Sequence, residues 1–215
     1  MRLVLDEKKT VFSLMRYTVY FCILMECVFL MWHFAETFKE ITFEEYAIVE
    51  NLQLILLFLT SVLFLIQSVF KTHYRALSLF LGSLCLMAGC RELDSWFDEL
   101  WIFGWKFALI FPAFSLIYIY YHLNDFRKSL IEFCSSSAFF MMYSVAIVIL
   151  PVAQCTGHKT FFVNVLGSGV EPRLVRRLFE ESLEFIGYTL LLLSCIEYYI
   201  VLVRDKVKST QKKIK

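Results

Sequence analysis

Ionisable and amide side chains gather at the ends of three apolar stretches of the chain. They lie at the start of the stretch 47–70, at the end of the stretch 75–97, and just before and inside the start of the stretch 182–203. These side chains are Glu50, Asn51, Arg91, Glu92, Asp94, His158, Glu180 and Glu184. If the three ends converge in the folded chain, the side chains form one polar pocket.

Two kinds of chemistry suit such a pocket. Carboxylates together with an imidazole are ligands for a divalent cation, and the candidate metal ligands are Glu92, Asp94, His158 and Glu184. Carboxylates that repel one another can also share a proton and act as an acid or base near neutral pH. The structural alternative is a rim of interhelical salt bridges that holds the outer end of the bundle.

The apolar stretches that position these residues are long enough to cross a membrane. The chain has 215 residues, and 59% of them are hydrophobic, whereas soluble domains average about 45–50%. We therefore predict an all-α fold, an integral membrane bundle of about six transmembrane helices, since a bilayer takes about 20 apolar residues in each helix. The expected spans are 11–34, 47–70, 75–97, 101–122, 134–155 and 182–203.

The limits of two spans follow from the residues beside them. The N-terminal apolar run lacks the short apolar core and small-residue cleavage site of a secretory signal, so we expect it to remain as the first span. The stretch from Arg75 to Cys90 is too short to cross a bilayer. We therefore expect the third helix to continue through Arg91, Glu92 and Asp94 and to end near the outer surface.

The charges between the spans predict their orientation. The N-terminus, residues 71–75, residues 123–132 and the tail from Arg204 onward carry most of the Lys and Arg, and the opposite side carries most of the acids. Because positive residues favour the cytoplasm, both termini are expected to be cytoplasmic. The chain then divides into a transmembrane domain, 1–203, and a basic cytoplasmic tail, 204–215. The net charge of +1 predicts no attraction to nucleic acid.

Two carboxylates lie deeper in the predicted membrane. Glu26 lies in the first span, seven residues before His33, and Glu197 lies in the last span, seven residues before Arg204. Arg16 of the first span is at a depth comparable to that of Glu197. This predicts an Arg16–Glu197 ion pair and contact between the first and last helices. In the alternative, Arg16 extends its side chain to the cytoplasm and Glu197 is neutral.

One part of the chain resembles a group of known proteins. The stretch FEEYAIVENLQLILLFLTSVLFLIQ, followed by LCLMAGCRELDSW, is similar to uncharacterised bacterial polytopic inner-membrane proteins. In those proteins an acidic residue opens one helix, and a Glu-rich, Trp-containing stretch closes the next. The resemblance implies a bacterial inner-membrane setting and carries no activity with it.

These observations favour a multi-pass membrane protein whose carboxylate-rich pocket on the periplasmic face binds a cation or a polar head group. A divalent cation is the candidate cofactor. One alternative is a membrane-embedded enzyme that acts on a lipid or isoprenoid head group through the candidate metal ligands. A second alternative is a structural subunit whose outer rim recognises a partner protein. The expected partners are the lipid bilayer and either a membrane protein or a further copy of the chain.

Overall fold

Every element of the computed structural model that is described here is helical, as the composition predicts. The structure describes residues 2–38, 48–70, 72–100, 102–153, 155 and 172–214. In chain order the elements are α1 (Arg2–Phe38), α2 (Ile48–Phe70), α3 (Thr72–Glu92), α4 (Asp94–Leu100), the 3₁₀ helix η2 (Gly104–Leu109), α5 (Ile110–Tyr121), α6 (Leu123–Cys134), α7 (Ser137–Ile147), the π-helical segment η3 (Val148–Ala153) and α10 (Pro172–Ile214).

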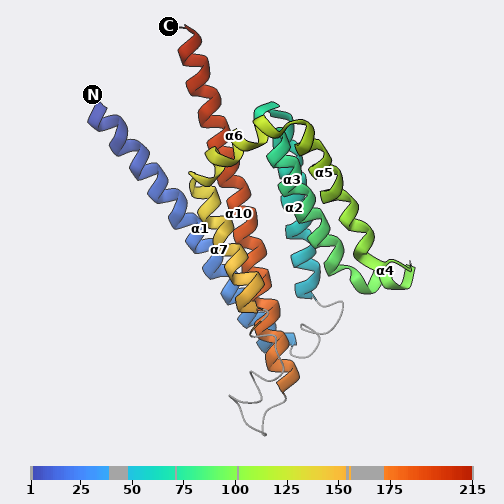
Figure 1. The fold of residues 1–215 in the computed structure, drawn as a ribbon. Helices are drawn as coiled ribbons and strands as arrows, with labels where there is room; N and C mark the ends of the chain where they lie inside the picture. The colour runs from blue at the N-terminus through green and yellow to red at the C-terminus, as the bar shows by residue number, and fades with distance from the viewer. Residues whose placement is uncertain are drawn as a thin grey trace.

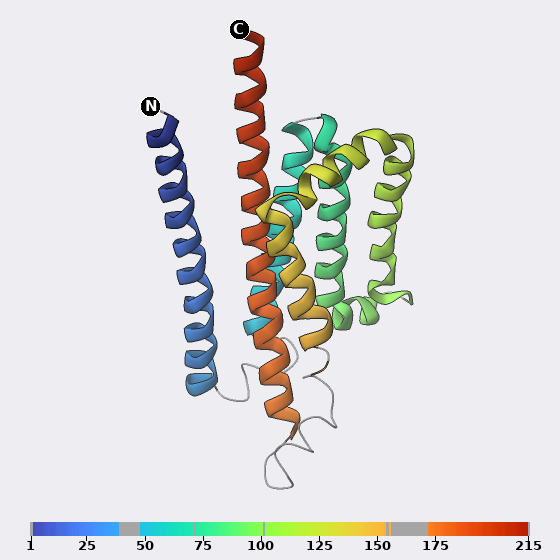
Figure 2. The ribbon, with the colours of Figure 1, turned by 60° about the vertical axis from the view of Figure 1, so that its left-hand side comes forward.

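The long helices alternate in direction along the chain (Figures 1 and 2). As a result, α1 begins and α10 ends at the same end of the bundle, which we call the terminal end. The opposite end, where α3 ends and α10 begins, we call the rim end. The segment α6 lies at the terminal end and α4 lies at the rim end (Figure 1).

Within the described residues, four helical segments are long and apolar enough to cross a membrane: Thr10–Phe34, Ile48–Val69, Gly104–Tyr121 and Val175–Arg204. A fifth span is formed if the bent pair of α6 and α7 counts as one crossing. These segments correspond to the predicted first, second, fourth, sixth and fifth spans. The protein therefore has the helices of a membrane protein, which match four of the six predicted positions, or five if the bent pair is one crossing.

The third predicted span differs from the others. Its helix, α3, is not among the segments that are apolar enough to cross a membrane, because polar and small residues interrupt it. Ser78, Gly82 and Ser83 of this helix are nevertheless buried, since α3 packs against α2, α5 and α6. Protein rather than lipid covers much of this helix, so its surface does not need to be uniformly apolar.

The expectation that the third helix continues through Asp94 is wrong. Helix α3 ends at Glu92, a turn follows at Leu93, and Asp94 begins the separate short helix α4. An acid in the first turn of a helix is favoured by the helix dipole, which suits Asp94 to this position. The chain then turns back at Gly104, whose φ of +52° lies in the left-handed region. A Cβ at this glycine would also collide with Asp98.

A sharp bend connects α6 to α7. The two helices meet at 83°, so α6 crosses the terminal end while α7 runs along the bundle. Ser129 and Phe133 on α6 face inward and are buried. The Ser136 side chain accepts a hydrogen bond from the Phe139 backbone N–H at 3.4 Å. This N-cap satisfies a backbone donor of α7 that has no partner within the helix.

Two hydrophobic clusters hold the bundle. The larger cluster joins α2, α3, α6, α7 and α10, and Tyr198 of α10 contacts the rings of Phe64, Tyr74 and Phe133 within it. The smaller cluster joins Met31 of α1 to α2 and α10. Helix α10 belongs to both clusters and is therefore the central helix of the bundle.

Candidate functional site

A buried ion pair joins α1 to α10. Arg16 Nε lies 2.9 Å from Glu197 Oε2, and Arg16 Nη2 donates a hydrogen bond to Glu197 Oε1 at 2.9 Å. Ser137 Oγ at the start of α7 also donates to Oε1, at 2.8 Å. Glu197 is 1% exposed. The structure thus brings together the two residues that the sequence analysis pairs.

Two tyrosines complete the surroundings of this carboxylate. The hydroxyl of Tyr17 donates to Glu197 Oε1 and that of Tyr20 donates to Oε2, each at 3.3 Å. The Arg16 guanidinium carbon also lies 5.1 Å from the centre of the Tyr17 ring, within the range of a cation–π contact. Because α1 and α7 both supply donors to this one carboxylate of α10, we interpret the group as a structural clamp.

A second polar group lies at the rim end, between α3 and α10. Arg91 Nη2 donates to Glu92 Oε1 at 2.9 Å and lies 3.7 Å from Glu184 Oε1. Tyr188 donates through its hydroxyl to Glu92 Oε1 at 2.8 Å. The side chains of Glu92 and Glu184 are 11% and 7% exposed, whereas that of Arg91 is 43% exposed. Two buried acids therefore surround one partly open guanidinium, and the group carries net negative charge when both acids are ionised.

The start of α2 is fastened to α10 beside this group. Gln53 Nε2 donates to both the backbone oxygen and Oε2 of Glu181, at 3.0 Å in each case. Gln53 is fully buried. Its amide oxygen has no hydrogen-bond partner among the described residues.

Most of the other predicted pocket residues lie near this end of the bundle. Glu50 is half-buried and Asn51 exposed in the first turn of α2. Asp94 is exposed at the start of α4, and Glu180 is half-buried on α10. His158 lies outside the described residues. The structure therefore brings Arg91, Glu92 and Glu184 of the predicted set together, and it adds Tyr188, Glu181 and Gln53 beside them.

The described part of the chain contains no group of three or more His, Cys, Asp or Glu side chains placed to hold a metal ion. Within that part, Glu92 and Glu184 are instead bound to Arg91, and Asp94 is on a separate helix. A metal site that includes His158 stays a prediction. The contacts seen here are those of the rim of salt bridges that the sequence analysis gives as the structural alternative.

An apolar cavity opens beside the rim group. Its volume is about 370 Å³, and its walls come from α2, α3, η2, α7, η3 and α10. Leu81, Leu84, Met142, Val145 and Leu191 are among the apolar residues that line it. Such a volume is within the usual range of small-molecule sites, which are mostly apolar with a few polar groups.

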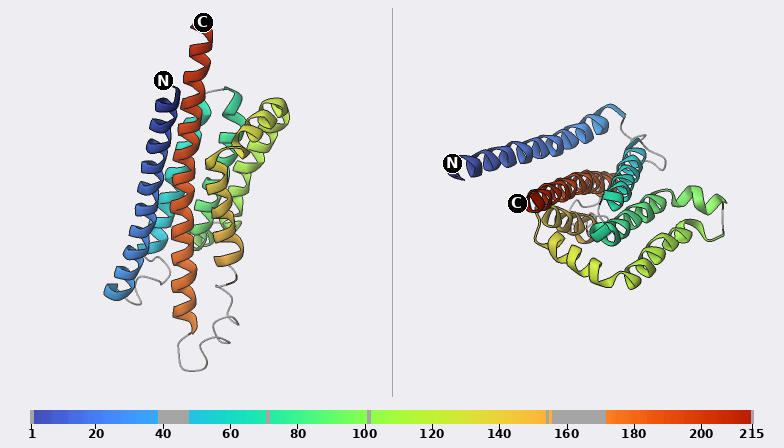
Figure 3. Two further views of the ribbon diagram at one scale, coloured as in Figure 1. Left: turned by 90° about the vertical axis from the view of Figure 1, so that its left-hand side faces the viewer. Right: turned by 90° about the horizontal axis from the view of Figure 1, so that it is seen from above.

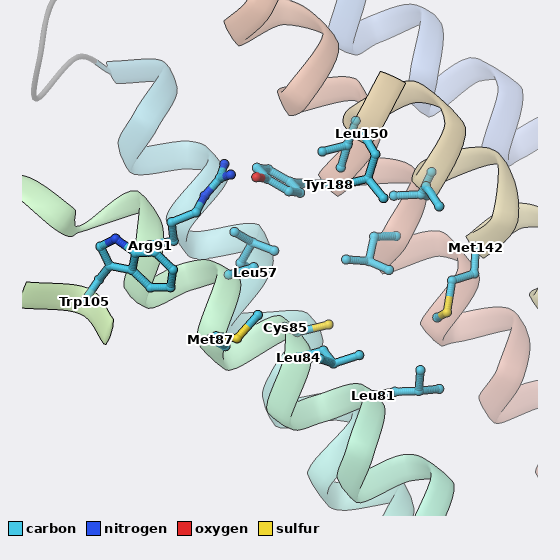
Figure 4. A pocket seen from close by; sticks show the side chains of 15 residues that line it. Leu57, Leu81, Leu84, Cys85, Met87, Arg91, Trp105, Met142, Leu150 and Tyr188 are labelled. Atoms are coloured by element: carbon cyan, nitrogen blue, oxygen red, sulfur yellow. The ribbon is translucent and has the colours of Figure 1, made fainter. Parts of the chain in front are cut away.

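The polar groups of this cavity lie together. Arg91, Tyr188 and Trp105 are part of its lining. Figure 4 shows the Arg91 guanidinium and the Tyr188 phenol turned toward one another, with Trp105 on the other side of Arg91 and with Leu81 and Met142 farther along the cavity. The cavity is therefore amphipathic: a charged end at the rim is continuous with an apolar interior.

One wall of the cavity is the π-helical segment η3. Ile149 and Leu150 of this segment line the cavity. Pro151, which has no backbone N–H, is part of the same helical segment. Proline cannot make the regular helical hydrogen bond, and single π-helical turns are frequent at functional sites. Gly187 of α10 accommodates the segment closely, because a Cβ there would lie 2.5 Å from Ile149 Cγ1. Gly187 thus positions the wall next to Tyr188.

A second cavity, of about 470 Å³, lies between α2, α3 and α5. Its polar lining includes Ser83 and Ser115, whose hydroxyls are 3.1 Å apart and hydrogen-bonded to one another. These two groups satisfy each other, whereas Arg91 in the first cavity is partly exposed. We therefore take the first cavity as the candidate site.

Three contributors to the rim were not among the predicted site residues: Gln53, Glu181 and Tyr188. Helix periodicity contains the signal for two of them. Glu181, Glu184 and Tyr188 follow one another at spacings of three and four, which places them on one face of a helix. Glu180 also lies four residues from Glu184, so periodicity by itself does not choose between Glu180 and Glu181.

No protein-family model matches the chain, and no curated protein or solved structure matches it either. The resemblance of residues 43–67 and 84–96 to bacterial inner-membrane proteins therefore stays a prediction. The function has to be inferred from the chemistry of the cavity and the rim.

Proposed function

We propose that this protein binds a lipid-like ligand, with an apolar chain in the cavity and a polar head group at Arg91. The observation that supports this most directly is the continuity between the apolar interior and the partly exposed guanidinium. Of the two ligands that the sequence analysis considers, a head group is favoured over a free cation. A cation would have to compete with Arg91 for both Glu92 and Glu184, and the apolar walls would contribute nothing to its binding.

The surroundings of Arg91 favour a zwitterionic head group. A phosphate suits the guanidinium, because arginine binds phosphate oxygens through charge-assisted hydrogen bonds. An ammonium group beside that phosphate suits Glu92 and Glu184, which outweigh the single positive charge when both are ionised. Tyr188 and Trp105 are amphipathic aromatic residues of the kind that membrane proteins place at the level of lipid head groups.

A cavity-filling substitution tests the proposal. In Ala146→Phe the larger side chain occupies the cavity that Ala146 lines. We expect the amount of lipid that remains bound through detergent washing to fall by about tenfold, which corresponds to about 1.4 kcal/mol of binding free energy. Native mass spectrometry of the purified protein measures this occupancy and identifies the lipid class.

The matched control is Ala113→Phe, the same substitution at an exposed position of α5 that does not line the cavity. It should retain the bound lipid of the wild-type protein. Equal occupancy in Ala146→Phe and the wild type would contradict a ligand in this cavity. Retained lipids without an ammonium group would contradict the zwitterionic head group alone.

The orientation belongs to the same proposal: six crossings of a bacterial inner membrane with both termini in the cytoplasm. The positive residues at the terminal end support it. We expect a fluorescent protein fused after Lys215 to fold and fluoresce, and alkaline phosphatase fused there to be inactive. Phosphatase fused after Phe103, at the rim end, should be active. The reverse pattern would place Arg91 on the cytoplasmic side.

A further inference from the structure

Helix α1 packs against the rest of the bundle on one narrow face. Only 11% of the most apolar 18-residue stretch of α1 is buried, compared with 50% of the corresponding stretch of α10. Arg16, Tyr20, Cys27 and Met31 are on the packed face, where each contacts α10 or residues packed on it. Seen along the bundle, α1 forms one edge of the molecule (Figure 3). Much of its surface is therefore available to lipid or to another protein.

The exposed surface of α1 includes a carboxylate. Glu26 is exposed and makes no ion pair or hydrogen bond with any residue that the structure describes. It lies within the apolar segment Thr10–Phe34, eight residues from the end of that segment and hence about 12 Å along the helix. Ionisable side chains at such depth rarely face lipid, and they are usually satisfied by protein or water.

The residues around Glu26 form a regular stripe. It consists of Met15, Val19, Cys22, Glu26, Phe29 and His33, all of which are exposed. Their spacing alternates between four and three residues, which is the spacing of the packing seam of a coiled coil. Bulky side chains on this seam can interdigitate with a partner helix, and Glu26 is its central polar residue.

We propose that α1 pairs in parallel with α1 of a second copy of this chain, through this seam and with the two Glu26 side chains in contact. Copies inserted in one orientation and related by a two-fold axis along the membrane normal bring each seam residue opposite itself. Carboxyl groups on two facing helices can hydrogen-bond to one another when they share a proton, so a seam with one central carboxyl is complementary to a second copy of itself. Polar side chains hydrogen-bond across membrane helices in this way.

Cys22 reports directly on this arrangement. It is a free, exposed thiol one turn from Glu26 on the seam, and seam residues of two closely packed helices come within the range of a disulfide. We expect mild oxidation of the wild-type protein in membranes to yield a disulfide-linked dimer. The dimer should be lost in Cys22→Ser and retained in Cys155→Ser, which removes another exposed thiol. Its yield should persist when the protein is diluted with lipid, since random collisions decline on dilution.

Substitution of Glu26 tests the carboxyl contact itself. Loss of one interhelical hydrogen bond weakens association about 3- to 30-fold, so Glu26→Leu should lower the Cys22 cross-linking yield at limiting protein density. Glu26→Gln keeps a donor and an acceptor and should retain the yield. Absence of cross-linking through Cys22, or a dimer linked through Cys155 alone, would overturn the proposal. An unchanged yield in Glu26→Leu would overturn the role of Glu26. Failure of lipid binding in the cavity would leave all these results unaffected.

Discussion

We expect Arg16→Met to lower the free energy of unfolding by about 3–5 kcal/mol, because it leaves the buried charge of Glu197 without its ionic partner. The remaining donors to Glu197, from Ser137, Tyr17 and Tyr20, are neutral and cannot replace the guanidinium. Methionine keeps much of the apolar stem of Arg16, so the change mainly removes charge. The loss is measured as the change in unfolding equilibrium on titration from mild detergent into a denaturing one.

A double substitution separates the ion pair from packing. Arg16→Met together with Glu197→Leu removes both charges, and replacing a buried pair by apolar residues is often neutral or stabilising. The double variant should therefore be more stable than Arg16→Met alone. Arg127→Met, at an exposed position of α6, is the control and should change stability by no more than about 0.5 kcal/mol. An Arg16→Met protein as stable as this control would mean that Arg16 and Glu197 contribute little as a pair.

A second large effect is expected where α2 and α3 pack most closely. A Cβ at Gly82 would lie 3.2 Å from Phe64 Cβ and 3.3 Å from the backbone oxygen of Ser61. Neither atom can move without moving α2. In addition, Ser61 Oγ donates to the Gly82 backbone oxygen at 2.8 Å. We expect Gly82→Val to destabilise the protein by about 1–3 kcal/mol, the usual cost of overpacking, measured by thermal unfolding in mild detergent.

Gly89, two turns farther along the same helix, provides the comparison. A Cβ there would meet its nearest neighbours at 3.6 Å, which is ordinary contact. Gly89→Ala should therefore be neutral or stabilising, since alanine is favoured over glycine in a helix by up to about 1 kcal/mol. Gly82→Ala has the same gain in helix propensity but should be less stable than Gly89→Ala. Equal stability of the two alanine variants would show that the two helices can separate at little cost.

Helix length and polarity allow the fold class to be predicted from the sequence. Long apolar runs predict the helices that cross the bundle, and four segments meet that criterion by themselves. The end of α3 could not be predicted in this way. A bilayer of ordinary thickness requires a longer helix, whereas in the structure a turn lies at Leu93 and a new helix begins at Asp94. A helix that protein surrounds does not have to satisfy the length rule that lipid imposes.

The two polar groups differ in how much the sequence could predict. Arg16 and Glu197 are charges of opposite sign at similar depth in apolar helices, and that suffices to suggest contact. At the rim many acids are available, and the helix rotation that selects Glu181 over Glu180 depends on how α2 and α10 pack. The choice of partner for Arg91 is similarly a tertiary effect.

The cavity could not be predicted from any single stretch of sequence. Its lining residues come from six elements, and most of them taken alone are ordinary apolar residues of a membrane helix. The cavity results from how the elements fit together. Pro151 in the π-helical segment and Gly187 on α10 are the local features that influence this fit, and their effect is evident only when the two segments are seen side by side.

The polarity of α3 has a consequence for biogenesis. For a segment with little apolar character, transfer from the insertion machinery into lipid is weakly favourable in free energy. Each charged residue in the segment makes this transfer less favourable. Helix α2 ends at Phe70 and α3 begins at Thr72, so the two can enter the bilayer together as a hairpin. In that hairpin the Ser61 hydroxyl of α2 donates a hydrogen bond to the Gly82 backbone oxygen of α3. The apolar surface of α2 then favours insertion of the pair, including the more polar α3. Because α2 is synthesised before α3, it is available to pair with α3 at insertion, and the orientation of the later helices depends on this step.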